Sequence, residues 1–152
     1  MKLHLKHLLL VLLLAGGSAV AQDESYDPKL ALKLGADAYG MKNYILVILK
    51  TGDTQMEDKA KRDKIFAGHM ENIKKMAESE KLAVAGPFGK NENAFRGLYI
   101  FNVTSMEEAK ELVSSDPTVA AGLLKAEYYP WYGSAAMGQV NEIHNKIAKE
   151  KF

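Results

Sequence analysis

The chain has 152 residues, of which 47% are hydrophobic, and it contains no cysteine. Its 20 basic and 19 acidic residues nearly balance, whereas nucleic-acid-binding domains are typically basic, so we exclude nucleic acid as a partner. Without cysteine there is no disulfide to stabilise an exported domain, so the hydrophobic core must stabilise the fold alone.

The first 21 residues have the pattern of a secretory signal peptide. Lys2 and Lys6 precede a leucine-rich run, and Ala19-Val20-Ala21 matches a cleavage site of small residues. The apolar stretch is shorter than the roughly 20 residues that span a membrane. We therefore predict an exported protein, periplasmic or secreted, with no membrane anchor after cleavage before Gln22.

The rest of the chain divides into three parts. We predict an N-terminal extension over 22–40 with a short helix, one α+β domain over 41–132, and a helical C-terminal extension over 133–152. Asp27-Pro28 is typical of a helix start and Gly35 of a helix end, which places the first helix.

Within the central domain, apolar runs and capping residues predict four strands and two helices. The predicted strands are 44–49, 82–85, 97–103 and 127–132, and the predicted helices are 58–81 and a segment that begins at the Ser105 capping box and ends before Pro117. The first strand is apolar on both faces, which is typical of a buried strand. Pro130 places the last strand at an edge of the sheet, because proline cannot donate to a ladder.

The resulting order, βαββαβ, is that of the ferredoxin-like α+β fold. Two core helices cover one face of a four-stranded sheet, yet its central strands are apolar on both faces. An uncovered apolar face indicates an interaction surface, and a second copy of the chain is its simplest cover. We therefore predict a homodimer that packs through the sheet face, unless the terminal helices cover that face instead.

The helix predicted over 58–81 carries a histidine on its inward side. Phe66, Met70, Ile73 and Ala77 form one apolar stripe, and His69 lies beside it, so its imidazole is expected to point toward the core. Such a histidine is either a satisfied core residue or a group that titrates near neutral pH in a catalytic site.

Several short motifs, taken together, resemble the YciI-like (YCII-related) domain. They are Gly68-His69-Met70, Ala85-Gly86-Pro87-Phe88, Gly97-Leu98-Tyr99-Ile100-Phe101, Glu107-Glu108-Ala109, Asp116-Pro117, Ala121-Gly122-Leu123 and Pro130-Trp131. The resemblance implies a dimeric α+β barrel related to the ferredoxin fold, with a site built from a helix histidine and an Asp-Pro aspartate. These residues correspond to His69 and Asp116. One branch of the family resembles dehydrochlorinases that act on hydroxylated aromatic rings.

A histidine paired with a carboxylate is a general acid/base device, because the carboxylate orients the imidazole and stabilises its charged form. We therefore predict a small-molecule enzyme, a lyase or isomerase, that uses His69 and Asp116 for proton transfer. Asp116 before Pro117 is also an ordinary helix N-cap, and one carboxylate oxygen can cap while the other faces His69. The alternative function is a non-catalytic ligand-binding or structural dimer module of the cell envelope.

Four further residues are candidates for substrate binding. Arg96 is a candidate to bind an anionic substrate, and the alternative interpretation is that it is an ordinary exposed loop arginine. Tyr99 and Trp131 are candidates to bind an aromatic ligand. The alternative interpretation is that they lie in the core or at a dimer contact. Phe88, which follows Gly86-Pro87, is the fourth candidate for substrate binding, and the alternative interpretation is that this segment only forms a turn.

Metal and cofactor signals are weak. There is no His-Glu-x-x-His motif, and His69 and His144 are the only histidines after the predicted signal peptide, so we predict no metal and no cofactor. Haem binding through His69 stays open, because related dimeric barrels bind haem. His144 is expected on the surface of the C-terminal helix.

Overall fold

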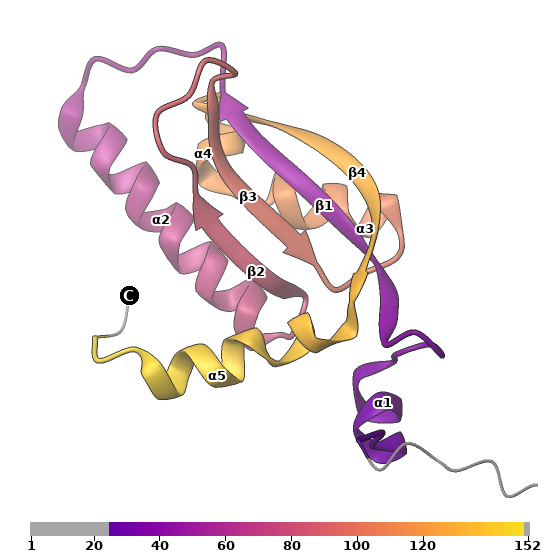
Figure 1. The fold of residues 1–152 in the computed structure, drawn as a ribbon. Coiled ribbons are helices and arrows are strands. Elements are labelled where there is room, and N and C mark those ends of the chain that lie inside the picture. The colour runs from indigo at the N-terminus through magenta and orange to yellow at the C-terminus, as the bar shows by residue number, and fades with distance from the viewer. Residues whose placement is uncertain (1–24, 151–152) are drawn as a thin grey trace, which may run out of the picture.

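The computed structural model describes residues 25–150 and shows a four-stranded sheet with helices packed against it (Figure 1). In chain order the elements are α1 (Pro28–Leu34), β1 (Met41–Thr51), α2 (Lys59–Glu78), β2 (Leu82–Pro87), β3 (Phe95–Phe101), α3 (Met106–Ser114), α4 (Pro117–Ala120), β4 (Leu124–Ser134), the 3-10 helix η1 (Ala135–Gln139) and α5 (Val140–Ile147). The predicted signal peptide lies outside the described residues and stays a prediction. Between residues 25 and 150, no helix is long and apolar enough to cross a membrane.

The sheet has the order β2-β3-β1-β4, and all neighbouring strands are antiparallel. The two central strands are β1 and β3, the first and third in the chain, as in the ferredoxin-like arrangement, and β4, which contains Pro130, lies at an edge as expected. The strand and helix order confirms the α+β, ferredoxin-like fold. The sequence indicated α4 only as a short turn, and it did not separate η1 from the rest of the predicted helical extension over 133–152.

Helices α2 and α3 cover one face of the sheet, where the main core lies. Val47 and Phe101 from the central strands are fully buried there against Met76 of α2 and Val113 of α3. Asp58 caps α2 by accepting a hydrogen bond from the amide of Lys61 at 3.0 Å.

The prediction that β1 is buried on both faces is only partly right. Ile45, Val47 and Leu49 are buried beneath the helices, but on the other face only Tyr44 is buried, and Leu46 and Ile48 are half-buried. The reason is that η1 covers only one end of that face, where its Met137 packs with Tyr44 and Trp131.

Only part of the apolar stripe predicted for α2 is buried: Ile73 packs against the core and Ala77 is half-buried. Phe66 and Met70 are 40% and 43% exposed, whereas Met76 is buried and the His69 side chain is only 13% exposed. The helix faces the sheet and α4 with His69 and Met76, and it turns Phe66 and Met70 toward a cavity. His69 therefore points inward, as predicted, and the buried side of α2 is partly polar.

The terminal helices form where the sequence places them, and both contribute little to the core. Asp27 caps α1, which has no buried residue. In α5 the apolar residues Ile143 and Ile147 are exposed, while Asn141 donates to the carbonyl of Leu82 on the edge strand β2 at 2.7 Å. The terminal helices thus leave much of the open sheet face uncovered (Figure 1).

Candidate active site

The close approach of α2 and α4 creates the site. Gly68 faces Pro117, and a Cβ atom at Gly68 would lie 3.1 Å from the ring of Pro117, so only glycine fits comfortably at this separation. His69 follows Gly68 on α2, and Asp116 precedes Pro117 as the N-cap of α4. The contact between the two helices thus places the imidazole against the carboxylate.

Asp116 is fully buried, and both of its carboxylate oxygens are bound. Oδ2 lies 2.7 Å from His69 Nδ1 and accepts a hydrogen bond from the Tyr99 hydroxyl at 2.9 Å. Oδ1 accepts from the amide of Thr118 at 2.9 Å and from its hydroxyl at 2.7 Å. One oxygen therefore caps α4 while the other faces His69, the double role that the sequence allowed.

These contacts determine how protons are distributed in the site. Burial alone would raise the pKa of Asp116, but the hydrogen bonds from His69 and Thr118 and the charge of His69 outweigh it and lower this pKa. Burial, together with the charge of Asp116, raises the pKa of the Tyr99 phenol, which therefore stays protonated and donates. Because an ionised carboxylate only accepts, Nδ1 of His69 must carry a proton.

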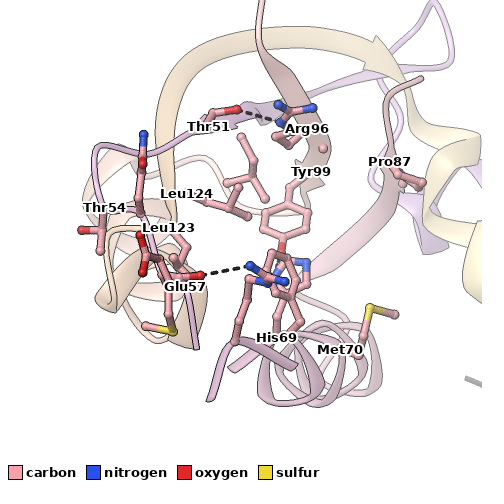
Figure 2. Close-up of a pocket in the computed structure, with 17 residues that line it drawn as sticks. Thr51, Thr54, Glu57, His69, Met70, Pro87, Arg96, Tyr99, Leu123 and Leu124 are labelled. Carbon is pink, nitrogen blue, oxygen red and sulfur yellow. Dashed lines mark hydrogen bonds between the residues drawn. The ribbon is translucent and has the colours of Figure 1, made fainter. Parts of the chain in front are cut away.

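The other imidazole nitrogen of His69 faces a cavity. No residue within 25–150 hydrogen-bonds with Nε2, and no buried side-chain nitrogen or oxygen in that range lacks a partner, so Nε2 is accessible. The cavity has a volume of about 710 Å³ and lies between α2, the central strands and the loop that follows β1 (Figure 2). In the neutral ring, Nε2 therefore presents a lone pair to this space.

The structure brings two of the four predicted substrate-binding residues to the cavity. Tyr99 and Arg96 line it, as Figure 2 shows. Phe88 does not: it packs on Phe95 with ring centroids 5.5 Å apart, in line with the turn alternative. Trp131 lies on the opposite face of the sheet from Tyr99, beside Tyr44, so its assignment to this site is corrected.

Sequence reasoning missed two residues of the site. Thr118 supplies half of the hydrogen bonds to Asp116, and it sits two positions after the cap, where any residue could stand. Arg62 also lines the cavity. Its position seven residues before His69, two helical turns on the same face, was a usable signal.

The site offers little to a metal ion. Within residues 25–150, no group of three or more histidine, aspartate or glutamate side chains is arranged to hold one. His69 and Asp116 are suited to proton transfer, and Tyr99 and Arg96 supply hydrogen-bond donors.

The lowered pKa of Asp116 predicts a specific acid sensitivity. A carboxyl whose pKa is depressed on folding stabilises the fold above its unfolded-state pKa of about 3.9, and this contribution is lost as the pH falls through the folded value. We expect the free energy of unfolding of the wild type to fall more steeply between about pH 5 and pH 2 than that of Asp116→Asn, which cannot ionise there. Urea unfolding over this range measures both slopes, and parallel curves would contradict the prediction.

Comparison with known proteins places the chain in a family. Residues 43–132 match the family model of the YCII-related domain, and the chain belongs to this family. The uncharacterized protein YjpA of Bacillus subtilis (strain 168) is 29% identical over 91 residues, which cover 60% of this chain and 95% of YjpA.

A solved structure with a partial likeness is that of 5-chloro-2-hydroxyhydroquinone dehydrochlorinase (TftG) from Burkholderia phenoliruptrix AC1100, in complex with 2,5-dihydroxybenzoquinone. The likeness covers 57% of this chain and 92% of TftG, with 20% sequence identity and a TM-score of 0.42. These values are too low to transfer a site or an activity to this chain.

Proposed function

We propose that the protein is a small-molecule enzyme in which His69 transfers protons to and from a substrate held in the cavity. The observation that carries this proposal is the orientation of the imidazole: Nδ1 is bound to a buried carboxylate, and Nε2 is accessible from the cavity. A base held in this way is preorganised, because Asp116 cannot turn away without losing its bonds to Thr118 and Tyr99.

In the proposed reaction, Nε2 of His69 removes a proton from the substrate, and Asp116 stabilises the imidazolium that forms. If the imidazolium returns the proton to another substrate atom, the result is an isomerisation. If the electron pair left on the substrate instead expels a leaving group, the result is an elimination that releases HX. Elimination from a hydroxylated aromatic ring is the first reaction to assay, because one branch of the family resembles dehydrochlorinases.

Turnover in a substrate screen tests this function. We expect His69→Gln to lower kcat by at least about 100-fold, the usual contribution of a general base. Its circular dichroism spectrum and melting temperature should stay close to those of the wild type. His144→Gln, on the peripheral helix α5, is the matched control and should retain turnover. Tight ligand binding without turnover, unaffected by His69→Gln, would instead identify a binding module.

We also propose that two copies pack through the open sheet face. Leu46 and Ile48 of β1 and Leu98 of β3 are half-buried there, and Tyr129 of β4 is 48% exposed beside them. An exposed apolar surface of this kind is typical of a subunit contact. Light scattering should give twice the chain mass for the wild type and the single mass for Ile48→Lys. Leu32→Lys on the exposed side of α1 should remain dimeric, and a monomeric wild type would contradict the proposal.

Export is likewise proposed, on the pattern of residues 1–21. The intact mass of the protein recovered outside the cytoplasm should correspond to a chain that begins at Gln22. A chain that retains Met1 through Ala21 in the cytoplasm would contradict export.

A further inference from the structure

The distribution of arginine in this chain is unusual. Arg62 and Arg96 are its only arginines, whereas 18 of its 20 basic residues are lysine. Both arginines line the cavity that Nε2 of His69 faces, and none of the lysines within the described residues lines it. Arginine and lysine carry the same charge, but only the planar guanidinium binds a carboxylate through two parallel hydrogen bonds. The cations at this cavity are therefore of the kind that recognises a planar anion.

Both guanidinium groups are oriented by neutral partners. Arg96 Nε donates to the hydroxyl of Thr51 at 2.7 Å, and Arg62 Nη1 donates to the carbonyl of Met56 at 3.0 Å. Among residues 25–150, neither arginine forms an ion pair with a carboxylate, although lysines do so at five places. Each guanidinium is thus anchored through one N–H and keeps further donors for a ligand.

The position of Arg96 fits a ligand that reaches the base. Figure 2 shows Arg96 and Thr51 at one end of the cavity and His69 at the other, with the ring of Tyr99 between them. A ligand whose anionic group is bound near Arg96 would extend along Tyr99 and bring its other end to Nε2. Arg96 is exposed at the mouth, where a charged ligand first meets the protein.

The charge of the cavity walls and the volume of the cavity further restrict the class of anion that fits. Glu57 is the one acidic residue among the described residues that line the cavity, so with two arginines and a neutral His69 the walls carry a single positive charge. The ionised carboxylate of Asp116 lies behind His69, 2.7 Å from Nδ1, and adds a negative charge beside the cavity. A monoanion therefore suits this site better than a phosphate dianion does. The remaining wall is largely apolar, with Leu49, Phe66 and Leu124 among its residues, and the volume of about 710 Å³ is that of a small-molecule site.

We propose that Arg62 and Arg96 form a carboxylate subsite and that the ligand of this cavity is a small organic monocarboxylic acid with an apolar or aromatic body. The proposal rests on the proposed function only in naming this acid as the substrate of His69. The binding of the acid itself stands on the two arginines.

Calorimetric titration of the mature protein with benzoate, benzamide and phenyl phosphate tests the subsite. We expect benzoate to bind at least about tenfold more tightly than its neutral isostere benzamide, and more tightly than phenyl phosphate. Arg96→Gln and Arg62→Gln should each weaken benzoate binding about tenfold and leave benzamide binding unchanged. Lys90→Gln, an exposed cation outside the cavity, is the matched control and should have no effect.

Equal binding of benzoate and benzamide, preference for phenyl phosphate, or benzoate binding that ignores both arginine substitutions would each overturn the proposal. The variant His69→Gln separates the test of the carboxylate subsite from the test of catalysis, because it removes the base and leaves both arginines. We expect this variant to keep the preference for benzoate over benzamide, because that preference depends on the arginines. If the carboxylate binds but no turnover depends on His69, the subsite stands and the catalytic proposal fails.

Discussion

Asp116→Ala should destabilise the protein by about 3–5 kcal/mol. The substitution leaves the hydroxyls of Tyr99 and Thr118 without their acceptor in a fully buried place, and His69 Nδ1 loses its partner. Each unsatisfied buried group costs roughly 1–3 kcal/mol. Because a domain of this size is stable by only about 5–15 kcal/mol, the loss is a large fraction of the total. Urea unfolding of the purified variant measures it.

The chain contains a matched control for this substitution. Asp27 also precedes a proline and also caps a helix, accepting from the amides of Lys29 and Leu30 at 2.9 and 3.0 Å, but α1 has no buried residue. Asp27→Ala should therefore cost no more than an ordinary cap, about 1 kcal/mol. Equal effects of the two substitutions would mean that Asp116 acts only as a cap and that its bonds to His69 and Tyr99 contribute nothing.

Gly52→Ala should destabilise the fold by about 3 kcal/mol and distort the cavity. A Cβ atom at Gly52 would lie 2.0 Å from the carbonyl oxygen of Gly122, where backbone meets backbone and no side chain can move aside. Two hydrogen bonds fix this contact: the amide of Gly52 donates to Leu123 at 2.8 Å, and the amide of Thr54 donates to Gly122 at 3.0 Å. Thermal unfolding monitored by circular dichroism measures the effect.

Gly89→Ala is the control for Gly52→Ala. Its Cβ atom would meet nothing within 4 Å, and Gly89 does not adopt a positive φ. We expect its stability to stay within about 1 kcal/mol of the wild type, because alanine mainly restricts the unfolded chain there. If Gly52→Ala were equally mild, the link between the loop after β1 and the start of β4 would be looser than the structure shows.

The fold was largely predictable because its signals are local. Asp58, Ser105 and Asp116 each cap the helix that the sequence places after them, and Pro130 marks the edge strand. The exposure of one end of the stripe predicted for α2 has a physical reason. Hydrophobicity alone ranks Phe66 and Met70 as core, but contact with Asp116 turns the polar His69 inward and leaves both of them at an open cavity.

The pair of His69 and Asp116 could be predicted, and Arg96 and Tyr99 were also placed correctly, but the way these residues combine in one site could not be predicted. Arg62 comes from α2 and Arg96 from β3, and only the tertiary arrangement shows that they share a cavity. Trp131 was misassigned because the sequence alone does not show which face of the sheet a strand residue lies on. Trp131 pairs with Tyr44 and Tyr99 pairs with Val47, and these two positions of β1 are three residues apart, so their side chains lie on opposite faces.

The proposed function depends on one property of the site: a buried carboxylate fixes the tautomer of His69 and leaves Nε2 as a base facing the cavity. Long-range proton–nitrogen NMR correlation of the imidazole at alkaline pH tests this claim most directly, with His144→Gln to assign the signals. We expect a proton on Nδ1 and none on Nε2 in the wild type. In Asp116→Asn we expect a shift toward the Nε2-protonated form, because the asparagine amide can donate to Nδ1. A proton on Nε2 in the wild type, or a tautomer that ignores Asp116→Asn, would contradict it.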